Sequence, residues 1–196
     1  MEILFATHNK NKLIEVKNLL PKGITILSLE DINYSNEVIE DKKTIIENAV
    51  KKASEIYKIT GRNCFADDTG LEVEELGGKP GVHSKRFAGK NADSMKNIKK
   101  LLKLMKNKSN RKARFVTVIS LIIDGKIKTF QGICNGQIAK EKKGDKGFGY
   151  DSIFIPKGEK LTFAQMEIHK KNTIAHIAIA VNKLVFFLKE QFNANS

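Results

Sequence analysis

Tryptophan is absent from this chain, cysteine occurs only twice, and no long apolar run is present. The longest apolar stretch, Phe115 to Ile123, is interrupted by Thr117 and Ser120, whereas a membrane-spanning helix needs about 20 apolar residues. Cys64 and Cys134 are far apart and form no CxxC pair. This spacing argues against both a disulfide framework and a zinc site. We therefore expect two buried thiols and no membrane helix.

The first residues also lack the basic leader, apolar segment and small-residue cleavage site of a signal peptide. We expect the protein to stay in the cytoplasm. With 41% apolar and 29% charged residues among 196, the composition is that of a globular chain rather than a disordered one. The length predicts one domain over residues 1–196, or two closely packed lobes.

Acidic residues are scarce relative to basic ones: 22 Asp and Glu stand against 35 Lys and Arg, a formal charge of +13. Clustered lysine and arginine attract phosphates, so the charge favours polyanionic partners. It does not distinguish a nucleotide from a nucleic acid. For the lysines between Lys96 and Lys108 we favour an ordinary solvated helix face over a phosphate-binding surface.

The apolar pattern predicts strands at residues 3–6, 64–66, 114–123, 127–133 and 152–155, and helices at 13–20, 44–57, 95–105 and 174–188. Thr44 and Glu47 form a capping box at a helix start. Asp124-Gly125 joins two strands in a tight hairpin. Strands and helices alternate before the hairpin, so we predict an α/β fold with a mixed sheet.

Polar loops at residues 7–12, 67–70 and 147–151 each follow a predicted strand, where ligands of open α/β sheets tend to bind. In the first loop, Thr7, Asn9 and Lys12 stand at a helix start and could bind phosphate oxygens. The alternative is an ordinary capped helix. The chain has no GxxxxGK[ST] sequence and no complete GxGxxG.

Asp67 and Asp68 are adjacent carboxylates at a predicted strand end. Their mutual repulsion is most easily offset by a divalent cation, although an Asx turn is an alternative. Because neighbouring strand side chains point to opposite faces, we expect one Asp in the site and the other bonded to nearby backbone. Glu40 with one Asp would suffice for Mg²⁺, which needs few protein carboxylates.

Phe148 and Tyr150 lie in a glycine-rich loop before Asp151. This arrangement could stack a purine and accept hydrogen bonds from its N–H edge. The alternative is that both rings are ordinary core aromatics. The histidines form no HExxH, and GxSxG is absent, so the sequence gives no signature of a zinc or serine hydrolase.

Taken together, these motifs resemble the Ham1-like family of inosine/xanthosine triphosphate pyrophosphatases. The resemblance extends from residue 7 to about 176 and rests on Thr7-x-Asn9-x-x-Lys12, the sequence from Phe65 to Leu71, the sequence from Gly77 to Ser84, and the sequence from Gly147 to Pro156. It implies a two-lobed α/β fold with a long central mixed β-sheet flanked by helices, an active-site cleft between the lobes, and a homodimer.

The resemblance also implies roles for individual residues. The triphosphate would bind to the loop Thr7, His8, Asn9, Lys10, Asn11 and Lys12 and to Lys52. Magnesium would bind to Glu40 and Asp68, and Asp68 would also be the proton acceptor that activates water. The remaining substrate contacts would be Thr69, Phe148, Gly149, Tyr150, Asp151, Lys171 and His176.

The expected activity is hydrolysis of ITP, dITP and XTP to the monophosphate and pyrophosphate, which removes them from the nucleotide pool. The match fails at Ile177, where the family has an arginine that contacts the base. We therefore expect narrower discrimination against ATP and GTP than in a relative that has the arginine. The alternative is that Ile177 merely packs in its helix and a neighbouring Lys or Arg makes the contact. Two rivals remain: a basic RNA- or DNA-binding protein without catalysis, and a pyrophosphatase of the same fold with altered base specificity. With the enzyme reading we expect no specific nucleic-acid partner.

Overall fold

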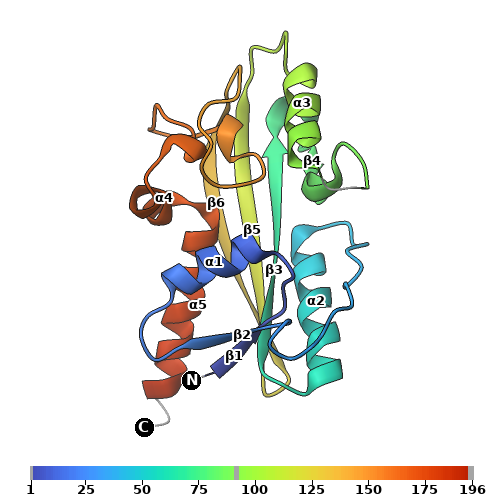
Figure 1. Cartoon of the computed structure of the whole chain (residues 1–196), viewed down its shortest axis with the longest axis vertical. Helices are drawn as coiled ribbons and strands as arrows, with labels where there is room; N and C mark the ends of the chain where they lie inside the picture. Colours follow the sequence, from blue (N-terminus) through green and yellow to red (C-terminus); the bar gives the residue numbers. More distant parts are fainter. Residues whose placement is uncertain (1, 91–92, 194–196) are drawn as a thin grey trace. The chain divides into compact units, whose positions relative to one another are not determined.

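The computed structural model describes residues 2–90 and 93–193, which fall into two compact units (Figure 1). Unit 1 consists of Met1–Asp68, Thr117–Gly132 and Ile177–Ser196. Unit 2 consists of Thr69–Val116 and Ile133–His176. The segments of the two units therefore alternate along the chain.

The strands are β1 (Glu2–Phe5), β2 (Thr25–Ser28), β3 (Cys64–Val73), β4 (Pro80–Gly81), β5 (Lys112–Ile123), β6 (Lys126–Ile138) and β7 (Phe154–Pro156). The helices are α1 (Lys10–Leu19), α2 (Ile45–Thr60), α3 (Ser94–Leu104), α4 (Ile168–Ile174) and α5 (His176–Asn193). The hydrogen-bonded strand order is β2-β1-β3-β5-β6-β7, with β4 beside β3. Parallel pairs (β1 with β2 and β3) and antiparallel pairs (β3 with β4, β6 with β7) both occur. The predicted α/β fold with a mixed sheet is confirmed.

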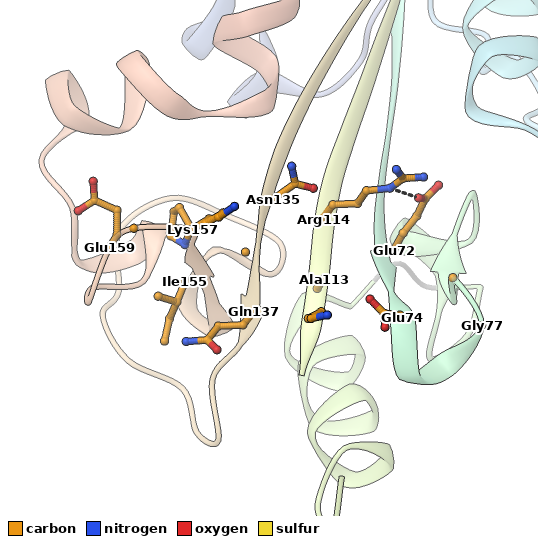
Figure 2. Close-up of a pocket in the computed structure, with 15 residues that line it drawn as sticks. Glu72, Glu74, Gly77, Ala113, Arg114, Asn135, Gln137, Ile155, Lys157 and Glu159 are labelled. Atoms are coloured by element: carbon orange, nitrogen blue, oxygen red, sulfur yellow. Dashed lines mark hydrogen bonds and ion pairs between the residues drawn. The ribbon is translucent and has the colours of Figure 1, made fainter. Parts of the chain in front are cut away.

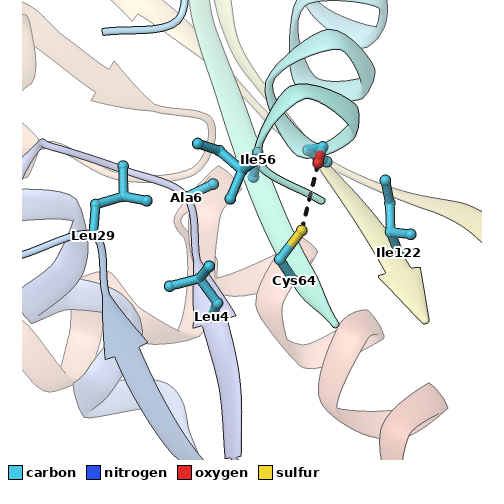
Figure 3. Packing of buried hydrophobic residues seen from close by; sticks show 8 residues of the cluster. Leu4, Ala6, Leu29, Ile56, Cys64 and Ile122 are labelled. Atoms are coloured by element: carbon cyan, nitrogen blue, oxygen red, sulfur yellow. Dashed lines mark hydrogen bonds between the residues drawn. The ribbon is translucent and has the colours of Figure 1, made fainter. Parts of the chain in front are cut away.

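In unit 1, alternation along β1 and β3 separates two packing faces. Leu4, Cys64 and Ala66 form a buried cluster with Ala53 and Ile56 of α2, and Figure 3 shows the Cys64 thiol directed at that helix. The intervening residues Phe5 and Phe65 are also buried, and their rings stack at 4.4 Å. In Figure 1, α1 and α5 lie on the side of these strands opposite α2. Helices on both faces explain why these short strands read as continuous apolar runs.

The ends of α2 are set by local sequence. Thr44 and Glu47 form the predicted capping box, in which the Thr44 side chain accepts from Glu47 N and the Glu47 side chain accepts from Thr44 N. Gly61 ends the helix in the left-handed conformation (φ 64°), which glycine adopts without steric cost. The hairpin prediction is also confirmed, because Asp124 and Gly125 both have positive φ at the tip between β5 and β6.

In unit 2, β6 pairs with β7 in the register Gly136↔Pro156. A Cβ at Gly136 would lie 2.3 Å from the carbonyl oxygen of Ile155, so only glycine permits this close approach. Phe154 packs between Phe115 and Phe163, at ring-centroid distances of 4.7 Å and 5.3 Å. These buried aromatics form much of the apolar interior beside β7.

Several element predictions were wrong. β3 continues through Asp67 and Asp68 to Val73, so the carboxylates do not stand at the end of their own strand. The short strand begins at Phe154 because Asp151–Ile153 is a 3-10 turn. The helix predicted at 174–188 is present as α5, but it begins at His176, because Ala175 is extended and Ile174 is the last residue of α4. β2 and α4 were not predicted.

The thiol prediction is confirmed, because Cys64 and Cys134 are both free and buried. Within residues 2–90 and 93–193, no single helix has the length and apolar composition needed to cross a membrane. α4 and α5 satisfy those two criteria only when they are counted together across the break between them.

Candidate active site

The loop after β1 is ordered by its own side chains. The Thr7 hydroxyl accepts from the backbone N–H of Asn9 at 3.2 Å. Asn9 is the N-cap of α1, and its Oδ1 accepts from the backbone N–H of Lys12 at 3.2 Å. The capped-helix alternative is therefore correct, and it is compatible with ligand binding because the cap fixes Lys12 on the first turn.

Lys12 reaches from α1 to β3. Its Nζ lies 2.5 Å from Asp67 Oδ2, and the two side chains are 15% and 3% exposed. From the sequence we expected one carboxylate of the pair to lie in the site and the other to bond nearby backbone. Asp67 is bound to a lysine of another element, a contact that sequence spacing does not reveal.

Lys52 of α2 contacts the other carboxylate of the pair. Its Nζ lies 2.8 Å from Glu40 Oε1 and 3.8 Å from Asp68 Oδ1. All of these side chains are largely buried, at 13% exposure for Lys52, 18% for Glu40 and 9% for Asp68. The structure thus brings together the three predicted residues Glu40, Lys52 and Asp68 within unit 1.

Pairing with β1 explains where this cluster lies. β3 pairs with β1 only at Cys64 and Phe65, because β1 ends at Phe5 and the chain then turns into α1. Asp67 and Asp68 follow just beyond that point, at the carboxyl end of β1. Ligands of open α/β sheets bind at such positions.

Burial and charge shift the pKa values of the cluster. Burial raises the pKa of Asp68 above its ordinary value, although Lys52 and Lys12 act to lower it. For Lys12, burial lowers the pKa, but the charges of Asp67, Asp68 and Glu40 and the hydrogen bond to Asp67 together raise it. Lys12 therefore stays an ammonium at neutral pH, and Asp68 is more basic than an exposed aspartate.

The other predicted residues of the first loop point elsewhere. The His8 ring bonds the carbonyl oxygen of Asn36 at 3.0 Å and stacks on Tyr34. Lys10 pairs with Glu30 at 3.2 Å, and both side chains are more than two thirds exposed (77% and 69%). Asn11 is exposed. Among the charged side chains of this loop, only Lys12 joins the carboxylate cluster.

In unit 2, the glycine-rich loop surrounds a buried ion pair. Asp151 Oδ2 accepts from the backbone N–H of Phe148 and from Lys171 Nζ, both at 2.9 Å. A Cβ at Gly147 would lie 2.2 Å from the same oxygen, so glycine is required there. Burial raises the pKa of Asp151, whereas Lys171 and the Phe148 N–H lower it. The ammonium also lies 5.6 Å from the centroid of the half-buried Phe148 ring.

The remaining predicted substrate contacts differ in their exposure to solvent; they are Tyr150, Thr69, Gly149 and His176. Tyr150 is 5% exposed, and its hydroxyl donates to the carbonyl oxygen of Ser84 at 2.9 Å. Thr69, the first residue of unit 2, and Gly149 are half-buried. His176 is 7% exposed and meets Phe115 edge-on at 4.4 Å.

Ile177, the position at which the resemblance fails, is 3% exposed near the start of α5. This burial agrees with the alternative that the side chain packs in its helix.

A pocket of about 810 Å³ also lies in unit 2 (Figure 2). Its walls carry charges of both signs, including the ion pair between Arg114 of β5 and Glu72 of β3 at 2.7 Å. Asn135 and Gln137 of β6 line it as well. No site residue predicted from the sequence lines this pocket.

Besides Asp67, sequence reasoning missed Asn97 of α3. Its amide donates to the carbonyl oxygens of Ser84 and Lys85 at 3.3 Å and 2.9 Å, and its Oδ1 accepts from Ala88 N at 2.6 Å. It thereby orders the chain beside the Ser84 carbonyl that receives Tyr150. A buried asparagine among helix lysines carries no sequence signal of this role.

The carboxylates of unit 1 suit a hard cation. The Lys52 ammonium lies within 4 Å of both Glu40 and Asp68, so their oxygens converge on a single cationic position. Over the described parts of the chain, no group of three or more His, Cys, Asp or Glu residues could hold a metal ion. Magnesium takes only one or two protein carboxylates and completes its shell with water and phosphate oxygens, so this donor set fits it.

Comparison with known proteins identifies the family. The family model described as the Ham1 family matches residues 3–187. The dITP/XTP pyrophosphatase of Christiangramia forsetii is 49% identical over 190 residues, covering 97% of this chain and 100% of the relative. That of Bacillus subtilis is 42% identical, covering 93% of this chain and 94% of the relative.

The solved structure of the Staphylococcus aureus Ham1 protein has a TM-score of 0.88 at 37% identity, covering 97% of this chain and all (100%) of that one. A HAM1 protein from Coxiella burnetii has a TM-score of 0.89 at 35% identity, covering 97% and 99%. Family model, relatives and fold agree, and the chain belongs to the Ham1 family.

Proposed function

We propose that this protein hydrolyses non-canonical purine nucleoside triphosphates, namely ITP, dITP and XTP, to the monophosphate and pyrophosphate. Relatives that match almost the whole chain carry the name dITP/XTP pyrophosphatase. The observation that carries the proposal is the cluster of Glu40, Asp67 and Asp68 with Lys12 and Lys52 at the carboxyl end of β1.

Asp68 is the proposed proton acceptor. Its burial makes the carboxylate more basic, which suits a group that deprotonates water. The water oxygen forms a bond to the α-phosphorus, the bond from that phosphorus to the bridging oxygen breaks, and its electron pair leaves with pyrophosphate. The water proton passes to Asp68.

The two lysines supply positive charge to the reacting phosphates. Lys12 stands at the N-terminus of α1, where backbone N–H groups also favour anions. Lys52 is held beside Asp68 by Glu40. Charge placed in advance where negative charge develops lowers the barrier without reorganisation during the reaction.

We propose Mg²⁺ as the metal, with Glu40 and Asp68 as its protein ligands. When bound, it would neutralise phosphate charge and polarise the phosphoryl oxygens. The oxygen-only donor set supports magnesium over zinc, which favours nitrogen and sulfur.

For the base, we propose contacts from Phe148, Gly149, Asp151, Lys171 and His176 of unit 2. The half-buried ring and backbone of the loop are suited to stacking and hydrogen bonding. The buried Asp151–Lys171 pair supports this proposal by fixing the loop around Phe148. Tyr150 would support the loop from its inner side, because its hydroxyl donates to the carbonyl oxygen of Ser84.

The test is pyrophosphate release from a panel of canonical and deaminated nucleoside triphosphates with Mg²⁺ present. The proposal requires release from dITP and XTP that chelation abolishes. The nucleic-acid-binding rival predicts no release but salt-sensitive retention on immobilised RNA or DNA. That rival leaves the carboxylate cluster without a role.

We also propose that the protein acts as a homodimer in the cytoplasm, where it meets the nucleotide pool. Light scattering after gel filtration would measure the mass of the particle in solution. A mass close to 22.0 kDa, that of one chain, would contradict the dimer.

A further inference from the structure

Asp67 and Asp68 are consecutive residues, yet their carboxylates serve different faces of β3. Asp68 lies on the face of Cys64 and Ala66, which packs against α2, and there it meets Lys52. Asp67 lies on the face of Phe65, and there it meets Lys12 of α1. The period of two along a strand thus gives each aspartate its own lysine partner.

Lys12 is held at both ends. Asn9 Oδ1 accepts from its backbone N–H at 3.2 Å, and Asp67 Oδ2 accepts from its ammonium at 2.5 Å. An ammonium has three N–H donors, so the bond to Asp67 leaves donors for other acceptors. A lysine held in this way loses less side-chain freedom when it binds a ligand than an unrestrained lysine does.

We propose that Asp67 is a positioning residue that fixes the Lys12 ammonium where the triphosphate binds. This inference rests on the proposed function, in which Lys12 is a phosphate ligand. Asp67 acts through Lys12 and does not itself touch the substrate. Asp67 and Asp68 lie on opposite faces of β3, so the positioning role of Asp67 is distinct from the role of Asp68 as proton acceptor.

If Asp67 instead competed with phosphate, removing it would change KM in the opposite direction. If Asp67 competed with phosphate for Lys12, its removal would free the ammonium and lower KM. If Asp67 positions Lys12, its removal releases the side chain and raises KM. The sign of the change in KM therefore decides between them.

The experiment measures kcat and KM for dITP in the parent, Asp67→Asn, Lys12→Ala and the double variant. Asp67→Asn should raise KM about ten-fold, the size of a charge-assisted hydrogen bond, with a smaller effect on kcat. Because Asp67 acts through Lys12, the double variant should be no worse than Lys12→Ala alone. A lowered KM, or losses that multiply in the double variant, would overturn the proposal.

Asp67→Glu keeps the charge and guards against misfolding of the amide variant, and its KM should fall between those of the parent and Asp67→Asn. A KM for Asp67→Glu no better than that of Asp67→Asn counts against the proposal. Glu55→Gln is the matched control, because it removes an exposed carboxylate 3.6 Å from Lys51 on α2. It should leave KM within two-fold (about 0.4 kcal/mol).

Calorimetric binding of inorganic tripolyphosphate separates this inference from the proposed function. A parent that binds tripolyphosphate but hydrolyses no nucleotide would refute the proposed function, while weaker binding by Asp67→Asn would still support the positioning role. Equal binding by the parent and Asp67→Asn, or no binding by the parent, would overturn it.

Discussion

Lys171 Nζ lies 2.9 Å from Asp151 Oδ2, and both side chains are more than nine-tenths buried, at 6% and 7% exposure. Removing one partner of such a pair leaves an uncompensated charge in the interior. Lys171→Met should therefore reduce the free energy of unfolding by about 3–5 kcal/mol, measured by urea denaturation at pH 7. The double variant Lys171→Met/Asp151→Asn should recover part of this loss, and equal losses in the two would contradict the explanation.

The same pair gives a pH dependence with a defined sign. Burial raises the pKa of Asp151, and loss of the ammonium would raise it further. A carboxyl whose pKa is higher in the folded state binds more protons there, so stability falls as pH rises from about 4 through the folded pKa. The destabilisation of Lys171→Met should accordingly be larger at pH 7 than at pH 5. Urea titrations at the two pH values measure it.

Asp68→Asn should fold and lose nearly all turnover. The substitution keeps the size of the side chain and removes the charge that accepts the proton. The expected loss in kcat is about 10²-fold or more, measured as pyrophosphate release from dITP. Turnover within a few-fold of the parent would rule out Asp68 as the proton acceptor.

Lys12→Ala should raise KM by a similar factor for every triphosphate in the panel. A phosphate contact carries no information about the base, and a hydrogen bond to a charged group contributes about 1.5–3 kcal/mol. Ranking kcat/KM across ITP, XTP, ATP and GTP tests this expectation. A reordered ranking with unchanged affinity would mean that Lys12 does not bind phosphate.

Two interpretations of Ile177 make different predictions for base selectivity. The missing arginine predicts narrow discrimination between ITP and ATP, whereas burial of Ile177 at 3% exposure indicates a packing role. If packing is its role, Ile177→Val should cost about 0.5–1.5 kcal/mol of stability and leave the ITP to ATP ratio of kcat/KM unchanged. A shifted ratio in this folded variant would show that the position affects the base.

Both cysteines should resist thiol reagents in the folded protein. Burial raises the pKa of Cys64 to about 12 and that of Cys134 to about 11, and the thiolate is the reactive form. Since these values exceed the unfolded value of about 8.5, the contribution of the thiols to stability declines as pH rises above that point. Labelling with a disulfide reagent at pH 8 should be slow in buffer and complete in guanidinium. Rapid labelling of either thiol in buffer would contradict its burial.

Local sequence predicted the features that depend on neighbouring residues. The capping box at Thr44 and the hairpin at Asp124-Gly125 are both present, because each is determined by side chains a few positions apart. The start of the C-terminal helix was placed at Ile174 rather than His176, because alanine favours helix and the apolar stripe extends back across Ala175. Sequence periodicity therefore located the helix but not its first residue.

The candidate site shows the same limit. Glu40 and one aspartate of the pair were proposed from their carboxylate chemistry, the family resemblance added Lys52 and selected Asp68, and the structure brings the three together. The Lys12–Asp67 pair joins residues 55 positions apart, and no local pattern indicates it. The sequence did contain one usable signal: alternation along β3 assigns Asp67 and Asp68 to different faces. What the alternation could not supply is which helix covers each face.

The interleaving of the two units has a consequence for dissecting the protein. Unit 1 is assembled from Met1–Asp68, Thr117–Gly132 and Ile177–Ser196, and β3, β5 and β6 each begin in one unit and end in the other. No single cut can release a fragment that contains all the residues of one unit and none of the other. A protease that nicks a surface loop should therefore leave two pieces that are each incomplete, and truncation is unsuitable for studying either unit in isolation.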